Sequence, residues 1–457
     1  MGLHQSNKGL TLPISGAPVQ SITPAQPVTE VALLADDFPG MKPRFLLREG
    51  EQVRRGQPIF EDRKLPGVVH TSPAAGTIAA IHRGARRALK SVVVELSEGE
   101  KSGNPEHFPF QAFTSAPAAE LSAEQVRALL IESGAWTHLQ TRPFSHTPAA
   151  DAVPAAIFVN AMDTNPLCAE ANVVLAQQQQ ALDAGLAALS RLTPGPTFLC
   201  VAPGSAFASG LSAPVTVEEF SGPHPAGTTG YHIHQLLPAH RGRTVFTVTA
   251  QEVVAIGNLF RSGQVSVERV VALGGPAAKN PRLIETRSGA SILQLTEGEL
   301  ASTHPVRLIS GSVLSGTAAS EPAYSFLGRR DTQISILEEA RERKLLGWLG
   351  LGLDQFSTIP TFLSAWLGKK SFALSTDTNG SPRAMVPIGM YERVTPWDIL
   401  PTHLLRALLV GDVEMAEKLG ALELDEEDVA LFSFVCPGKT NYGLILRSNL
   451  ERMFAEG

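Results

Sequence analysis

The stretch from Glu49 to Gly84 constrains the fold of this chain most strongly. It reads EGEQVRRGQPIFEDRKLPGVVHTSPAAGTIAAIHRG, so that Gly50, Gly56 and Gly76 separate short apolar runs. Glycine permits the positive φ angles of tight turns, and apolar residues that alternate along a strand fill one face of a small β core. The pattern therefore predicts an all-β module, which we expect to extend over residues 1–112.

The order of these glycines and apolar pairs resembles the barrel-sandwich of biotinyl and lipoyl domains. Such carrier domains attach their cofactor to a lysine at a hairpin tip, and Lys64 stands close to that point. Around it the sequence reads Glu-Asp-Arg-Lys-Leu-Pro-Gly, without the Met-Lys-Met or Asp-Lys-Ala setting of a modified lysine. We expect a structural module. The alternative is a carrier with biotin or lipoate on Lys64, which an intact mass equal to the bare sequence would eliminate.

Residues 120–262 carry alternating helix and strand patterns. Ser122–Gln125 and Thr249–Glu252 have the spacing of capping boxes and predict two helix starts. An Ala/Gln/Leu helix is expected over residues 170–192, between buried-type strands. Those strands are Ala156–Asn160 and Thr197–Val201. Strand, helix and strand at this spacing predict a βαβ unit with a parallel sheet, which we interpret as a Rossmann-like domain.

Two further regions complete the predicted organisation. Strand-like runs over residues 263–328 predict a mainly β unit, and apolar periodicity from about residue 395 predicts helices that close the region 329–457. The predicted fold class is thus a multidomain α+β and α/β protein.

The charge balance excludes one large class of partners. There are 38 Lys and Arg residues against 44 Asp and Glu, a formal net charge of −6. Nucleic acid, which requires a basic surface, is therefore not an expected partner. No apolar run approaches the ~18 residues of a membrane span, so a membrane role would have to come through a partner. The three cysteines are too few for a disulfide framework and favour a reducing cytoplasm.

A histidine-rich stretch, SGPHPAGTTGYHIHQLLPAH, is the densest polar cluster. We expect His232 and His234 to alternate on one face of a strand, and a third histidine of the stretch, His224 or His240, could complete a zinc set. No carboxylate or cysteine stands at ligand spacing, so we favour structural or partner-facing histidines and predict no metal site. No hydrolase motif is present, and no catalytic residue is assigned.

Several long strings together resemble the A subunits of the sodium-translocating NADH:quinone oxidoreductase (Na⁺-NQR) family. They include VALLADDFPGMKPRFLLREGEQVRRGQPIFEDRKLPGV, SGPHPAGTTGYHIH and CPGKTNYGLILRSNLERMFAEG, and the resemblance runs from residue 8 to residue 457. That family is similar in plan to the C subunit of the Rnf complex and to the flavin-bearing subunit of complex I. The resemblance implies a ubiquitin-like β-grasp (SLBB-like) domain at 263–328 and a C-terminal helical, ferredoxin-like domain without a cluster.

The resemblance also implies a function. The complex oxidises NADH, reduces ubiquinone to ubiquinol and exports Na⁺, so it serves electron transport, the respiratory chain and sodium transport. The chain is expected to be a subunit of this translocase, not catalytic by itself, at the cytoplasmic face of the bacterial inner membrane. Its expected partners are the other subunits, chiefly the integral membrane subunit that bears flavin. FAD, FMN, riboflavin and iron–sulfur centres are expected on those subunits.

Two departures from the relatives predict that this chain holds no flavin and no cluster. The stretch that matches the relatives' flavin loop, Gly134–Ser145, has one glycine and the bulky Trp136 and Phe144. A [4Fe–4S] cluster needs four thiolates, and beyond residue 200 only Cys436 remains. Cys436 is therefore expected to be a small buried side chain.

Quinone contact by this chain stays an open hypothesis. A quinone needs donors for its carbonyls and an apolar slot for its ring and tail. Two stretches mix such residues, and the candidates are Phe38, Met41, Arg44, Arg142 and Phe144. The alternatives are ordered interdomain loops in a pure scaffold subunit, or an Rnf-like or stand-alone flavin-dependent NADH dehydrogenase, which would show flavin absorbance.

Overall fold

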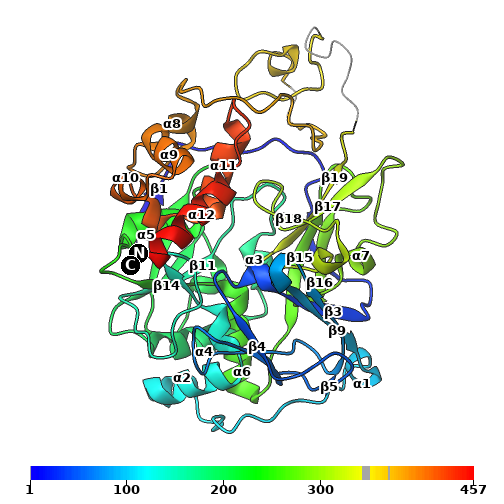
Figure 1. The fold of residues 1–457 in the computed structure, drawn as a ribbon, viewed down its shortest axis with the longest axis vertical. Coiled ribbons are helices and arrows are strands. Elements are labelled where there is room, and N and C mark those ends of the chain that lie inside the picture. The colour runs from blue at the N-terminus through cyan, green and yellow to red at the C-terminus, as the bar shows by residue number, and fades with distance from the viewer. Residues whose placement is uncertain (1, 342–349, 369–370, 457) are drawn as a thin grey trace.

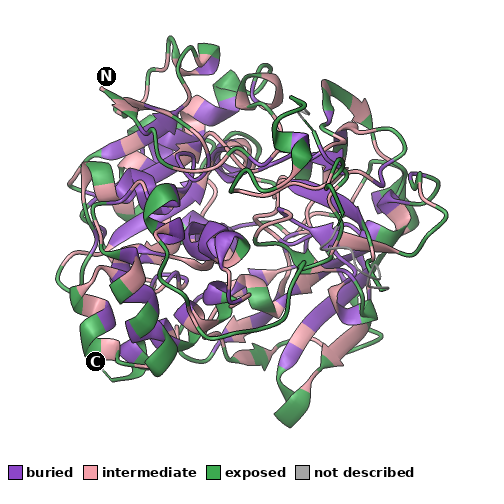
Figure 2. Cartoon of the chain, turned by 90° about the horizontal axis from the view of Figure 1, so that it is seen from above, coloured by how far each residue is buried: buried purple, intermediate pink, exposed green. Residues whose placement is uncertain are grey.

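The computed structural model describes residues 2–341, 350–368 and 371–456, and confirms a mixed α/β fold (Figure 1). Within these residues the strands form four sheets, of six, six, four and three strands. Buried residues concentrate inside the layers, and exposed residues follow the loops and outer helix faces (Figure 2). No described helix combines the length and apolarity that crossing a membrane requires.

The N-terminal β module consists of the two smaller sheets. The four-stranded sheet has the order β3-β9-β8-β5: Glu30–Leu34, Leu89–Leu96, Gly76–Arg83 and Gln52–Val53. The three-stranded sheet has the order β4-β6-β7: Pro43–Phe45, Pro58–Asp62 and Val69–Thr71. Val31, Ile59 and Ile78 are fully buried in one core cluster. Gly76 lets two strands approach, because a Cβ there would lie 1.9 Å from the Glu95 carbonyl oxygen.

The predicted βαβ unit is confirmed within a six-stranded sheet of order β1-β13-β12-β11-β14-β10. Only β10 is antiparallel to its neighbour. The strands are Leu3–Gln5, Thr216–Ser221, Thr197–Val201, Ile157–Ala161, Val245–Thr249 and Gln140–Arg142. Its helices are α2 (Ala123–Glu132), α3 (Ala171–Val174), α4 (Gln179–Ser190), α5 (Thr229–Leu236) and α6 (Ala250–Ser262). Both predicted capping boxes are present, at Ser122 and at Thr249.

The single helix predicted over residues 170–192 is wrong. The chain forms α3 and α4 with a turn between them, after Leu175, whose side chain is buried in the core. The break redirects the chain so that α4 packs closely on α6. Two glycines permit this approach: a Cβ on Gly257 would lie 1.8 Å from the Ala181 carbonyl oxygen, and one on Gly185 would lie 2.1 Å from that of Val253.

The second six-stranded sheet has the order β18-β17-β19-β15-β16-β2. The strands are Thr317–Ala318, Val306–Ser310, Gln333–Glu338, Glu268–Gly274, Arg282–Arg287 and Val19–Pro24. Pairing crosses the predicted ranges in three places. β1, from the range 1–112, is an edge strand of the first large sheet, and β2, from the same range, is an edge strand of the second. β19 belongs to the second large sheet although it lies beyond residue 328. The ranges 1–112, 120–262, 263–328 and 329–457 stay predictions as domains, and part of the last lies outside the described residues.

Helices close the chain as predicted. They are α8 (Met390–Val394), α9 (Pro401–Val410), α10 (Val413–Lys418), α11 (Glu426–Val435) and α12 (Tyr442–Ala455). Their apolar faces share one core cluster with the first large sheet, through residues such as Phe158, Phe220 and Phe432. The shorter helices are α1 (Glu98–Lys101), α7 (Ile292–Leu295), η1 (Ala35–Asp37), η2 (Ala85–Arg87), η3 (Ala118–Glu120), η4 (Ala135–His138), η5 (Ala206–Ala208), η6 (Pro322–Tyr324), η8 (Leu363–Ala365) and η9 (Ala421–Glu423).

Candidate functional site

A wide cleft with a volume of about 2670 Å³ is lined by the N-terminal β module, the β17–β19 region, described residues between 354 and 381, and the C-terminal helices. We call it the interdomain cleft. Its lining mixes apolar and charged side chains, as a site for an amphiphilic molecule requires. The apolar residues include Phe38, Met41, Ile309, Leu314, Phe356 and Phe434, and the charged residues include Lys42, Glu426, Lys439, Arg447 and Glu451.

Phe38 and Met41, two of the predicted quinone residues, lie on this cleft. They belong to the turn that follows η1, where the Met41 amide donates to the Phe38 carbonyl at 3.2 Å. The Phe38 ring is 3% exposed and packs edge-on against His70, with ring centroids 4.4 Å apart. The Arg329 guanidinium lies 5.6 Å from its centroid on another side. Met41 is only half-buried and is therefore the more accessible of the two.

Arg44, Arg142 and Phe144 are not among the residues that line the cleft. Arg44 is exposed on β4 and forms an ion pair with Glu61 on β6. Arg142 is buried at the end of β10, where it donates to Asp425 Oδ2 at 3.0 Å. Phe144 packs against Phe454 of α12, with ring centroids 5.3 Å apart. The structure therefore places Arg142 and Phe144 in a junction with the C-terminal helices.

The two predicted stretches nevertheless meet. A Cβ on Gly40, in the turn after η1, would lie 3.2 Å from the His146 ring. His146 is hydrogen-bonded to Glu451 at 2.7 Å, and Glu451 lines the cleft. The C-terminal helix α12 thus joins both stretches at one end of the interdomain cleft. Nothing in the local sequence indicates this contact, because the three segments lie far apart in the chain.

The junction around Arg142 holds four carboxyl groups at the start of α11, of which Asp428 is buried and Asp425, Glu426 and Glu427 are half-buried. The guanidinium of Arg142 and that of Arg447 outweigh burial and hold the pKa of Asp425 well below its ordinary value. For Glu427, burial, then the charges of Asp163 and Asp428, raise the pKa to about 8. Neighbouring carboxyl groups thus differ in protonation near neutral pH, and Arg142 acts as the counter-charge that attaches α11 to the sheet.

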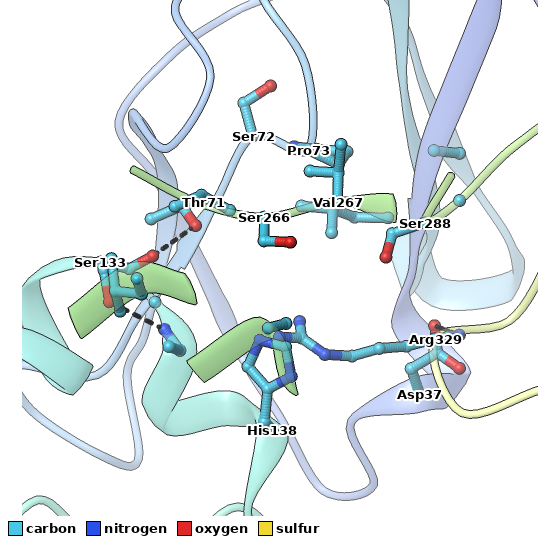
Figure 3. A pocket seen from close by; sticks show the side chains of 18 of the residues that line it. Asp37, Thr71, Ser72, Pro73, Ser133, His138, Ser266, Val267, Ser288 and Arg329 are labelled. Carbon is cyan, nitrogen blue, oxygen red and sulfur yellow. Dashed lines mark hydrogen bonds between the residues drawn. The ribbon is translucent and has the colours of Figure 1, made fainter. Parts of the chain in front are cut away.

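A second, much smaller cavity of about 60 Å³ lies where the three β-containing regions meet (Figure 3). The N-terminal module contributes Thr71 and Ser72, and the second large sheet contributes Ser288. His138 and Arg329 extend side by side into it, as Figure 3 shows. This volume is enough for a few water molecules, since one needs about 10–15 Å³ by the same measure.

A buried charged group stands beside this cavity. Glu252 of α6 is 1% exposed, with its Oε1 3.5 Å from His138 Nδ1 and 3.8 Å from Arg329 Nε. These three atoms have no hydrogen-bond partner among the described residues, so water in the cavity would satisfy them. Burial alone would raise the pKa of Glu252, but His138 and the nearby arginines outweigh it and hold it at about 2. The sequence marked Glu252 only as a capping residue.

The histidine prediction is wrong in its geometry. His232 and His234 lie on helix α5, not on a strand, so their side chains do not share a face. His232 is fully buried with its Nε2 3.1 Å from the Ala226 carbonyl oxygen, whereas His234 Nδ1 lies 2.7 Å from Glu423 of η9. His224 Nδ1 lies 3.3 Å from the Thr164 hydroxyl. The described residues contain no group of three ligands that could hold a metal ion.

The structure also shows the surroundings of Lys64 and Cys436. Lys64 is exposed in a tight turn, where its amide donates to Asp62 Oδ1 at 2.9 Å. Cys436 is 1% exposed, which confirms the predicted burial. The Tyr391 hydroxyl donates to its Sγ at 3.1 Å and lies 2.9 Å from the Tyr442 hydroxyl.

Comparisons with known proteins bear on these features. Family models match residues 5–97 ("NqrA N-terminal barrel-sandwich hybrid domain"), 121–265 ("NqrA second alpha/beta domain") and 270–321 ("NQRA C-terminal domain"). The first match confirms the predicted barrel-sandwich. The hydrogen-reduced NAD⁺-reducing [NiFe]-hydrogenase is a weak structural likeness, with 13% identity, a TM-score of 0.39, and coverage of 76% of this chain and 65% of that chain.

Curated relatives match the chain over nearly its full length. The A subunit of the Na(+)-translocating NADH-quinone reductase of Pasteurella multocida is 51% identical over 98% of this chain and 99% of its own. The protein of the same name from Yersinia pseudotuberculosis is 50% identical over the same shares. Identity at this level over the whole length, together with the three family models, shows that the chain belongs to the NqrA family, the A subunits of the Na(+)-translocating NADH-quinone reductase.

Proposed function

We propose that this chain is a peripheral subunit of the sodium-translocating complex and borders the step in which ubiquinone is reduced with electrons from NADH. It docks from the cytoplasmic face of the inner membrane, chiefly on the flavin-bearing membrane subunit. The observation that carries this proposal is the interdomain cleft, which combines apolar residues with hydrogen-bond donors. Its volume of about 2670 Å³ exceeds the ~300–1,000 Å³ of an ordinary small-molecule pocket and leaves room for an isoprenoid tail.

The residues of the chain support a role without a resident redox centre. Trp136, within the stretch that matches the relatives' flavin loop, is fully buried, and its Nε1 donates to the Pro148 carbonyl at 2.9 Å. The Cys436 sulfur has tyrosine hydroxyls as neighbours, and the three cysteines of the sequence are fewer than a [4Fe–4S] cluster needs. FAD, FMN, riboflavin and iron–sulfur centres would then reside on other subunits.

The finer fold assignments belong to this proposal. We assign the α/β unit as Rossmann-like because it is mainly parallel with helices following its strands. The second large sheet with α7 is assigned as β-grasp (SLBB-like), and the C-terminal helices as a ferredoxin-like scaffold without a cluster. In this plan the scaffold supplies one wall of the cleft.

Titration of the full chain with a short-chain, water-soluble ubiquinone analogue tests the quinone contact. Met41→Asn places a polar side chain on the cleft wall. We expect this variant to bind the quinone analogue at least tenfold more weakly, because the quinone ring loses apolar contact surface. Arg44→Gln is the matched control, since Arg44 lies outside the cleft lining. Equal affinities for both variants and the natural chain, or no binding at all, would leave the chain a scaffold subunit.

A second measurement tests the absence of a flavin. We expect the purified chain to have no absorbance near 450 nm and an intact mass equal to its sequence. Flavin absorbance would instead support an Rnf-like or stand-alone NADH dehydrogenase, and added mass on Lys64 would support a carrier function.

A further inference from the structure

Positive charge is concentrated in one part of the N-terminal module. Residues 42–90 contain eleven Lys and Arg against four Asp and Glu, a net of +7, in a chain whose formal net charge is −6. The rest of the chain therefore carries a net of −13. Such an uneven distribution of charge affects association with charged partners and is not required for folding.

Strand pairing gathers these charges at one edge of the module. We define the basic patch as Lys42, Arg44, Arg63, Arg83, Arg86 and Arg87. The Arg63 amide donates to the Lys42 carbonyl at 2.8 Å, next to the β4–β6 pairing. The Arg83 guanidinium lies 5.1 Å from the ring centroid of Phe45 on β4, and its Nη1 donates to the Arg87 carbonyl at 3.3 Å.

The patch is exposed and mostly without counter-charge. All six residues are exposed, and only Arg44 forms an ion pair, with Glu61, among the residues that the structure describes. The other five are among the residues that line the interdomain cleft. Several carboxylates elsewhere on that cleft already have partners: Glu339 pairs with Arg307, Glu426 with Arg447 and Glu451 with His146. The cations are therefore available to an external anion.

We propose that the basic patch binds the anionic phospholipid headgroups of a membrane surface. The proposal rests on the peripheral membrane role proposed above. Clusters of four to eight Lys and Arg residues attract anionic leaflets, and each contributes about a fivefold gain in affinity. The charges stand on exposed positions of β4, the end of β8, η2 and the turns beside them, which suits mobile headgroups more than one rigid ligand. The net negative remainder of the chain is screened beyond about 8–10 Å at physiological salt.

This contact would also orient the chain. Five patch residues border the interdomain cleft, so a membrane held by the patch would lie beside the cleft mouth. An apolar substrate that partitions into the bilayer would then reach Phe38 and Met41 without crossing bulk water.

Co-sedimentation of the full chain with vesicles tests the proposal. We expect binding to vesicles of 70% phosphatidylcholine and 30% phosphatidylglycerol, none to pure phosphatidylcholine, and a strong loss when salt rises from 50 to 300 mM. The variant Arg63→Gln/Arg86→Asn/Arg87→Asn removes three exposed charges. Asn suits positions 86 and 87 because their φ angles are 53° and 61°. We expect this variant to bind the anionic vesicles tenfold or more weakly.

The matched control removes three exposed cations elsewhere: Lys279→Gln/Arg406→Gln/Lys418→Gln. We expect it to bind like the natural chain. Equal losses in both triple variants, or no binding of the natural chain to anionic vesicles, would overturn the lipid proposal. Co-purification with the membrane subunits separates the two ideas. If the patch variant keeps vesicle binding but leaves the complex, the patch contacts an acidic protein surface and not lipid, whereas the subunit role survives.

Discussion

At the scale of single residues, Arg142 and Arg44 show how burial decides the value of an ion pair. Arg142 has a side-chain exposure of 5% and contacts Asp425 and, at 3.9 Å, Asp428. Removing one partner of a buried pair leaves a charge without compensation. We expect Arg142→Gln to lower the free energy of unfolding by about 3–5 kcal/mol, measured by urea denaturation.

The variant Arg44→Gln is the control for Arg142→Gln, because it removes an exposed ion pair. Arg44 has a side-chain exposure of 61%, so solvent screens its pair with Glu61. We expect a change of at most about 1 kcal/mol. A similar loss in both variants would show that Arg142 does not hold α11 against the sheet. The sequence could not separate these two arginines, because the partner of Arg142 lies 283 residues away.

At the scale of elements, the contact between α4 and α6 depends on glycine. We expect Gly257→Ala to destabilise the chain by about 3 kcal/mol, because its Cβ would lie 1.8 Å from a backbone oxygen of α4. Intrinsic helix propensity alone predicts the opposite sign, a gain of about 1 kcal/mol. Thermal or urea unfolding measures the difference.

Gly443 of α12 provides the control for that substitution. A Cβ there would meet its nearest atoms at 3.5 Å, which is ordinary van der Waals contact. We expect Gly443→Ala to be neutral or to stabilise by up to about 1 kcal/mol. Destabilisation of the same size by both substitutions would contradict the importance of the α4–α6 contact.

Helices and strands could be predicted from the sequence where their signals lie in neighbouring residues. The capping boxes at Ser122 and Thr249 and the βαβ order were predictable because they depend on neighbouring residues. The segment of His232 and His234 was not, since two alternating histidines fit a strand as well as a helix over so few residues. Phe38 and Met41 were predicted from the sequence and lie on the cleft, and their role toward quinone stays a prediction, whereas the contact of their turn with α12 depends on tertiary packing.

At the scale of the whole molecule, buried histidines predict sensitivity to acid. Burial is the main cause that lowers the pKa of His70, His138 and His232 to about 3 and of His224 to about 4. The unfolded chain binds these protons from pH 6.5 downward, so each histidine removes stability as the pH falls, by about 1.4 kcal/mol per pH unit.

The half-buried carboxyl groups of Asp37 and Glu427 act in the opposite direction. Burial raises the pKa of Asp37 to about 7 and that of Glu427 to about 8, so the folded chain binds their protons first. These two carboxyl groups offset part of the stability that the histidines remove. The offset stops growing near pH 4, where the same carboxyl groups also bind protons in the unfolded chain. We expect the free energy of unfolding to fall steeply below about pH 4.5. Urea midpoints from pH 7 to 3.5 test this, and a flat profile down to pH 3.5 would contradict it.

The placement of the first two strands has a consequence for biosynthesis. β1 must wait for β13, which ends at Ser221, and β2 must wait for β16, which ends at Arg287. Both strands are therefore translated long before the strands that they pair with. Because both strands pair at sheet edges, loss of β1 and β2 would expose two edges at once, and the newborn chain depends on staying unaggregated until β16 has been translated.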